Sequence, residues 1–86
     1  MSYQIQYAEE VVREDIPKLP KANREQIKTA IEQRLTVDPL GFGKPLRYSL
    51  RGHRRLRVGD WRVIYRIESG RVFVVKIGNR KEVYDG

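Results

Sequence analysis

The stretch HRRLRVGDWRVIY, residues 53–65, concentrates arginine in two short strand-like runs that Gly59-Asp60 joins. Its four arginines are Arg54, Arg55, Arg57 and Arg62. If Gly59-Asp60 forms a two-residue turn, Arg57 and Arg62 face each other on the same side of a β-hairpin. Like charges opposed across a sheet repel, so this pair, without a partner inside the protein, indicates an anion supplied from outside. Because the planar arginine fork binds phosphate oxygens bidentately, we expect that anion to be a phosphate.

Strand alternation adds a histidine to this positive side, because His53 and Arg55 share the side of Arg57. The opposite side is apolar, with Leu56, Val58, Val63 and Tyr65. His53 is the only histidine, the residue type best suited to exchange protons near neutral pH, which makes it a possible general base; the alternative is a surface or packing residue. An open positive face suits the phosphate of an extended single strand better than a duplex groove, since no helix here is basic enough to be a recognition helix.

The net charge of +7 is unevenly distributed along the chain. Residues 1–43 hold six Lys/Arg and seven Asp/Glu, whereas residues 44–86 hold twelve Lys/Arg and four Asp/Glu. Nine of those twelve cations are arginine, which favours phosphate binding at close range. The alternative is a solubilising surface, but such a surface normally mixes signs and uses more lysine.

Composition limits the class of protein and the kind of site. Eighty-six residues are enough for one domain, and we expect a single domain over residues 1–86. The chain has no cysteine, which excludes disulfides and thiolate metal sites, and we expect no cofactor and no metal. We find neither a membrane-spanning apolar run nor a signal peptide, and therefore expect a cytoplasmic protein without membrane contact.

Hydrophobic periodicity predicts an α+β domain. Alternation at Tyr3, Ile5 and Tyr7 indicates a strand, and a short helix follows from Ala8 until Pro17 ends or kinks it near Ile16. A second helix runs from about residue 21 to 35, with Asn23 as a possible N-cap, and residues 37–46 form a loop. Strands over 54–58, 61–67 and 72–77 complete a three-strand antiparallel meander, so the two-helix hairpin packs on one sheet. Trp61 is expected to be a core anchor, and Glu9, Glu10, Glu14 and Asp15 a solvated helix face.

Two segments, GKPLRYSLRGHRRLRVGDWRVIYRI and VFVVKIGNRKEVY, resemble the C-terminal half of the RelE/ParE toxin superfamily. The resemblance implies the same order of elements over nearly the whole chain. Members that resemble RelE are toxins of toxin–antitoxin pairs that cut messenger RNA in the ribosomal A site. Members that resemble ParE inhibit DNA gyrase and lack the nuclease residues. The resemblance also implies a cognate antitoxin, small and acidic, in a hetero-oligomer that covers the arginines.

The resemblance assigns roles to individual residues. Arg55 and Arg57 match basic residues that act on the attacking 2′-hydroxyl, and Arg62 matches the arginine that holds the scissile phosphate. Arg80 matches a proton donor to the leaving 5′-oxygen, and Tyr84 a tyrosine that orients or stacks on the nucleotide. Further RNA contacts are assigned to Lys44, Arg47, Arg54 and Arg55.

Two points of chemistry and geometry follow. The positions of Arg55 and Arg57 hold lysine in the best-known member, and arginine, with a pKa above ~12, rarely loses a proton. Arg57 is therefore expected to act as an electrostatic clamp rather than as a base. Strict alternation from a turn at Ser69-Gly70 would place Arg80 on the face opposite Arg62, and a bend at Gly78 would remove this conflict.

Three functions are compatible with these residues. The first is a ribosome-dependent, metal-independent endoribonuclease that leaves a 2′,3′-cyclic or 3′-phosphate and a 5′-hydroxyl. The second is a ParE-like gyrase inhibitor without nuclease activity. The third is a non-catalytic RNA-binding module. The combination of Arg57, Arg62, Arg80 and Tyr84 favours the first.

Overall fold

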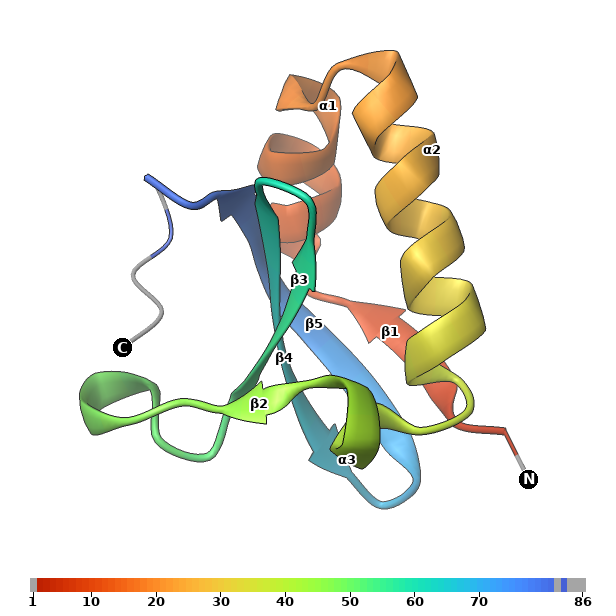
Figure 1. The fold of residues 1–86 in the computed structure, drawn as a ribbon, viewed down its shortest axis with the longest axis vertical. Coiled ribbons are helices and arrows are strands. Elements are labelled where there is room, and N and C mark those ends of the chain that lie inside the picture. The colour runs from red at the N-terminus through yellow and green to blue at the C-terminus, as the bar shows by residue number, and fades with distance from the viewer. Residues whose placement is uncertain (1, 82, 84–86) are drawn as a thin grey trace.

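The computed structural model describes residues 2–81 and 83, which form a five-stranded sheet with helices on one face (Figure 1). The strand order is β1-β5-β4-β3-β2. The strands are β1 (Gln4–Tyr7), β2 (Lys44–Pro45), β3 (Arg54–Val58), β4 (Trp61–Glu68) and β5 (Arg71–Asn79). The predicted α+β class and the antiparallel meander β3-β4-β5 are confirmed, and β1 adds to β5 in parallel.

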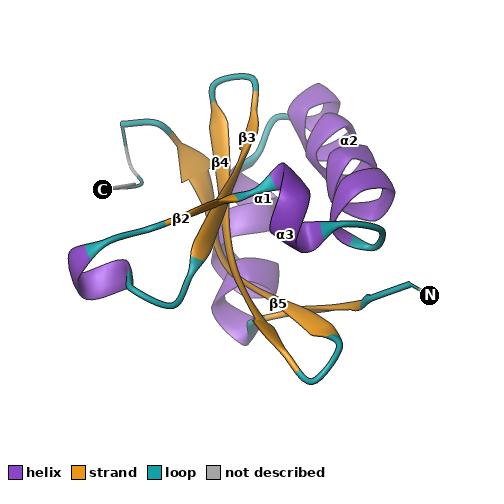
Figure 2. Ribbon diagram, turned by 60° about the horizontal axis from the view of Figure 1, so that its bottom comes forward, coloured by secondary structure: helices purple, strands orange, loops and turns teal. Residues whose placement is uncertain are grey.

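Two helical segments cover the sheet (Figure 2). A π-helical segment, Val11–Asp15, leads into α1 (Ile16–Lys18), and α2 (Lys21–Ala30) continues into a second π-helical segment, Ile31–Leu35. Apolar positions three and four residues apart, including Ile27, Ile31 and Leu35, bury one stripe against Leu56, Val63 and Tyr65 of the sheet. Within the described residues, no helix has the length and apolar character needed to cross a membrane.

The helix ends differ from two predictions. The helical segment that begins at Val11 continues past Pro17 to Lys18, and the chain leaves the helix at Leu19, which is extended. Asn23 lies inside α2, because Pro20 is the N-cap residue and α2 begins at Lys21.

The predicted loop over residues 37–46 is partly ordered into regular structure. It contains a short helix, α3 (Pro39–Phe42), whose N-terminus is capped when Gly41 N donates to Asp38 Oδ1 at 2.9 Å. It also contains β2, which pairs with β3 so that Lys44 lies opposite Arg55. The region after it, Tyr48–Leu50, forms a 3₁₀ turn.

The register of the hairpin confirms the predicted pairing. Arg57 lies opposite Arg62, and Leu56 lies opposite Val63. Between β4 and β5 the register shifts by one residue, since Tyr65 pairs with Val74 but Ile64 pairs with Lys76. Val75 is therefore the extra residue of a β-bulge, and the prediction of a bend at Gly78 is wrong.

Asp15 is buried, with 8% of its surface exposed, so the prediction that it belongs to a solvated face is wrong. Ile77 N donates to Asp15 Oδ2 at 3.0 Å, and Lys76 Nζ donates to Asp15 Oδ1 at 3.2 Å. β1 pairs only with Arg71–Val74, so Asp15 binds the part of the β5 edge that β1 does not reach. The other three acidic residues of this segment are exposed, as predicted.

Candidate active site

The face of the sheet opposite the helices carries the predicted site, and we call it the arginine face: Arg55, Arg57, Arg62 and, by register, Arg80. It also has a small core of its own, formed by Leu46, Ile64 and Val83 with Leu50 and Val75 beside them. Arg55 pairs with Ile64 of this core, whereas the neighbouring Leu56 belongs to the core under the helices. The alternation of side chains along each strand thus separates the arginines of the arginine face from the core under the helices, which is the main core.

Arg62 is the buried member of the arginine face, with 6% of its surface exposed. Its Nη1 donates to Gly59 O at 3.2 Å and to Trp61 O at 3.1 Å, so the guanidinium is held against the hairpin turn. The expectation that Arg62 has no partner inside the protein is therefore wrong. Arg57, its cross-strand neighbour, is exposed. One arginine is fixed and the other extends into solvent, which is an arrangement that can bind an anion between a rigid and an adjustable cation.

The bulge at Val75 brings Arg80 to the same face. Because Arg62 pairs with Gly78, a residue two positions further along the chain follows on the side of Arg62. Arg80 N also donates to Asp60 O at 3.0 Å, which ties the end of β5 to the turn between β3 and β4. Gly78 adds no side chain beside Arg62. The structure therefore gathers Arg57, Arg62 and Arg80 around one hairpin turn.

Arg54 does not lie with these arginines. It pairs with Tyr65, whose side chain is part of the core under the helices. Its Nη2 donates to Leu40 O and to Gly43 O, each at 2.8 Å. Arg54 therefore holds α3 against the sheet, and this placement differs from the RNA contact expected from the sequence.

The other predicted residues are placed as follows. Lys44 is exposed and lies opposite Arg55, on the arginine face. Arg47 is exposed at the start of the 3₁₀ turn. Tyr84 lies outside the described residues. Trp61 is half-buried and packs against the main core, as predicted.

His53 is half-buried and lies directly before β3. It borders a hollow of about 240 Å³ together with Leu40, Arg54 and Ile67. Ile67 packs against the core under the helices, so His53 lies near residues of the opposite face. Its Nδ1 is buried and has no hydrogen-bond partner among the described residues.

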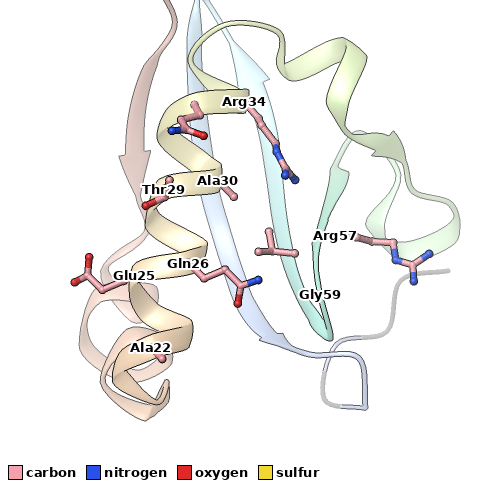
Figure 3. A pocket seen from close by; sticks show the side chains of 10 residues that line it. Ala22, Glu25, Gln26, Thr29, Ala30, Arg34, Arg57 and Gly59 are labelled. Carbon is pink, nitrogen blue, oxygen red and sulfur yellow. The ribbon is translucent and has the colours of Figure 1, made fainter.

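Another hollow, of about 510 Å³, lies between α2 and β3 (Figure 3). Gln26 and Arg34 extend from the helix side toward β3, whereas Arg57 points away from α2. The charged end of Arg57 therefore belongs to the arginine face and not to this hollow.

A smaller hollow of about 110 Å³ adjoins the arginine face. Two of the residues that line it, Arg34 and Phe42, have no role predicted from the sequence. It is lined by Arg34, Phe42, Lys44, Arg55, Leu56 and Arg57. The sequence offered one signal, an aromatic residue between two glycines in a segment expected to be a loop. Among the described residues, no group of three or more His, Cys, Asp or Glu side chains is arranged to hold a metal ion.

Two tyrosine hydroxyls have altered acidity. Burial raises the pKa of Tyr65 above its ordinary value of 10.0, and the neighbouring Arg54 opposes this change in part. Burial also raises the pKa of Tyr7, and the Glu32 carboxylate adds to the effect. Tyr65 Oη donates to Pro39 O at 2.5 Å, so its protonated form is structurally required.

The proteins that this chain resembles in sequence and in structure include toxins of toxin–antitoxin systems. Residues 3–84 match the family model described as ParE toxin of type II toxin-antitoxin system, parDE. Toxin RelG of Mycobacterium tuberculosis is 31% identical over 86 residues, covering 98% of each chain. Toxin RelE of the same organism is 35% identical over 72 residues, covering 81% of this chain and 74% of the relative. A chain in the crystal structure of the M. tuberculosis toxin-antitoxin complex RelBE2 superimposes with a TM-score of 0.86 at 29% identity, covering 93% of this chain and 100% of that chain.

Proposed function

Because this chain belongs to the family of ParE toxins of type II toxin–antitoxin systems, we propose that it is a ribosome-dependent endoribonuclease that cleaves messenger RNA. The observation that carries the proposal is the gathering of Arg57, Arg62 and Arg80 around one hairpin turn. Three cations near one turn can stabilise the negative charge that a phosphodiester gains in its transition state. The two curated relatives named above, both Rel toxins, support the same assignment.

The reaction divides the arginines into three roles. The 2′-oxygen attacks the phosphorus, the bond from phosphorus to the 5′-oxygen breaks, and the products are a 2′,3′-cyclic phosphate and a 5′-hydroxyl. Arg57 stabilises the developing charge near the 2′-oxygen, and Arg62, which its carbonyl partners hold in place, gives a fixed positive charge below the phosphate. Arg80 donates a proton to the leaving 5′-oxygen, which as an alkoxide is a stronger base than guanidine, and takes a proton back from water. Tyr84 orients the nucleotide, and Arg55, Lys44 and Arg47 bind the flanking RNA.

His53 is a weak candidate for the base that removes the 2′-hydroxyl proton. It lies near Arg54 and Leu40 rather than in the group formed by Arg57, Arg62 and Arg80. Arginine does not serve well either, because its pKa above ~12 keeps it protonated. The proton therefore passes to water or to a ribosomal RNA group, and the protein contributes mainly charge.

The partner of this toxin is a cognate antitoxin, small and acidic, that binds in a hetero-oligomer. The RelBE2 structure, which is a toxin–antitoxin complex, supports this proposal. An acidic chain over the arginine face would neutralise the cations that the nuclease needs. A toxin that acts on ribosomes works in the cytoplasm.

A second candidate function is inhibition of DNA gyrase, and the description of the matching family model as a ParE toxin favours it. A gyrase inhibitor has no need of three arginines around one turn, so we rank it below the nuclease. The third reading, a non-catalytic RNA-binding module, predicts RNA affinity without any cut.

The deciding experiment adds the protein to a translation extract and maps messenger ends by primer extension. We expect codon-phased cuts, a loss of about 100-fold or more in Arg80→Ala, and no loss in Arg71→Ala, an exposed arginine at the other end of β5. Inhibition of DNA supercoiling without cuts would establish the gyrase function instead. Equal cleavage by a folded Arg80→Ala variant would contradict the role given to Arg80.

A further inference from the structure

The hollow beside the arginine face combines positive charge with one aromatic ring. Its cations come from three parts of the fold: Arg34 from the end of the second helix, Lys44 from β2, and Arg55 and Arg57 from β3. Phe42 of α3 is the aromatic residue. Of the described residues that line this hollow, none is acidic.

Phe42 is unusual because a large apolar ring is left 51% exposed beside these cations. A phenylalanine that leaves half of its surface exposed gains only part of the burial energy that its ring could give the fold. A ring that faces solvent next to arginine is instead typical of surfaces that stack nucleic acid bases and bind their phosphates.

The backbone around Phe42 is held in place by two side chains from the sheet. Tyr65, which is fully buried, donates from Oη to Pro39 O at 2.5 Å. Arg54 Nη2 donates at 2.8 Å to Leu40 O on one side of Phe42 and to Gly43 O on the other. A Cβ atom at Gly43 would overlap the Tyr65 hydroxyl, so glycine is needed for this close approach. The sheet therefore fixes the position of an exposed ring, which is how a binding residue is preorganised.

We propose that this hollow is a nucleotide subsite in which the ring of Phe42 stacks on an RNA base next to the scissile phosphate. The hollow shares Arg55 and Arg57 with the arginine face, so a base held here and a phosphate held there belong to neighbouring nucleotides. Arg34 and Lys44 bind the phosphate that follows the stacked base. The proposal rests on the proposed nuclease function and extends it to the recognition of the strand beside the cut.

The test measures cleavage of a defined messenger RNA on programmed ribosomes, with toxin concentration varied to separate half-saturation from maximal rate. Phe42→Leu should raise the half-saturating concentration about 5- to 100-fold, since one stacked base contributes roughly that much. Phe42→Trp, which keeps an aromatic ring, should have the wild-type half-saturating concentration. Leu40→Ala is the matched control, because Leu40 is a 58% exposed apolar residue of the same helix outside this hollow. Thermal melting of each variant checks the fold.

The decisive readout replaces a single messenger base by an abasic nucleotide, first on one side of the cut and then on the other. At one of these positions the abasic nucleotide should raise the half-saturating concentration of the wild type and leave that of Phe42→Leu unchanged. The effects of the two changes are then not additive. The proposal is overturned if the effects of the two changes add at every position. It is also overturned if Phe42→Leu has the same half-saturating concentration as the wild type. A loss that Phe42→Trp does not restore would assign the ring to a protein partner instead. If the wild type makes no cuts, the proposed nuclease function fails and this proposal fails with it.

Discussion

Removing the Asp15 carboxylate should destabilise the protein strongly, although the sequence suggests a solvent-exposed position. In Asp15→Ala, the Ile77 N–H loses its acceptor at the part of the β5 edge that β1 does not reach. A buried donor left without a partner costs about 1 to 3 kcal/mol. The ion pair with Lys76 adds at most about 1 kcal/mol, because the Lys76 side chain is 47% exposed. We therefore expect a loss of about 2 to 3 kcal/mol in the free energy of unfolding.

Two matched variants separate the hydrogen bond from the charge. Asp15→Asn keeps an oxygen that can accept from Ile77 N, and Lys76→Met removes only the ammonium. Each should cost about 1 kcal/mol or less. The melting temperature of Asp15→Ala should therefore fall by roughly 10 to 20 °C, and those of the other two by a few degrees, at about 4 to 8 °C per kcal/mol for a domain of this size.

Urea unfolding followed by the fluorescence of the single tryptophan, Trp61, measures the free energies, and hydrogen exchange of the Ile77 amide reports the bond itself. The Ile77 amide should be protected in the wild type and in Asp15→Asn and exchange faster in Asp15→Ala. Equal melting of Asp15→Ala and Lys76→Met, or an Ile77 amide that stays protected in Asp15→Ala, would refute this reasoning.

Three other predictions concern packing, alkaline pH and salt. Gly43→Ala should cost about 1 to 3 kcal/mol because its Cβ overlaps the Tyr65 hydroxyl, and a double-mutant cycle with Tyr65→Phe should show a cost smaller than the sum. The contribution of Tyr7 and Tyr65 to the free energy of unfolding should be constant below pH 10.0 and should fall as the pH rises above it. The reason is that their raised pKa values keep both hydroxyls protonated in the folded state while the unfolded state ionises. Phenylalanine at both positions should reduce this slope, and an unchanged slope would contradict the pKa directions. Affinity for single-stranded RNA should fall by roughly 0.7 log units per log unit of salt for each phosphate contacted, whereas a flat response would remove nucleic acid from the partners.

The sequence predicted the hairpin because its register depends on local information. A two-residue turn at Gly59-Asp60 determines which residues face each other, so the pairing of Arg57 with Arg62 followed from counting. Alternation of apolar and polar residues then gave the buried face. The charge asymmetry predicts that the functional residues lie in the C-terminal half, and the resemblance predicted the family that the family model matches.

What the sequence did not predict depends on contacts between distant segments. The bulge at Val75 has no turn residue to mark it, yet it decides the face on which Arg80 lies. Asp15 looked like its exposed neighbours, and only the β5 edge, 62 residues away in the chain, makes it a buried acceptor. Arg54 looked like the other arginines of its run until α3, which was expected to be loop, supplied carbonyl groups for it to bind.

The parallel pairing of β1 with β5 has a consequence for how the protein is made. Gln4 lies opposite Arg71, so the first strand has no partner until most of the chain has been synthesised. Contacts between such distant residues form late, after the local β3-β4-β5 meander. The proposed catalytic residues Arg57, Arg62 and Arg80 are also among the later ones to leave the ribosome that makes them. A nascent chain therefore lacks both a closed sheet and a complete set of these arginines until its synthesis is nearly finished.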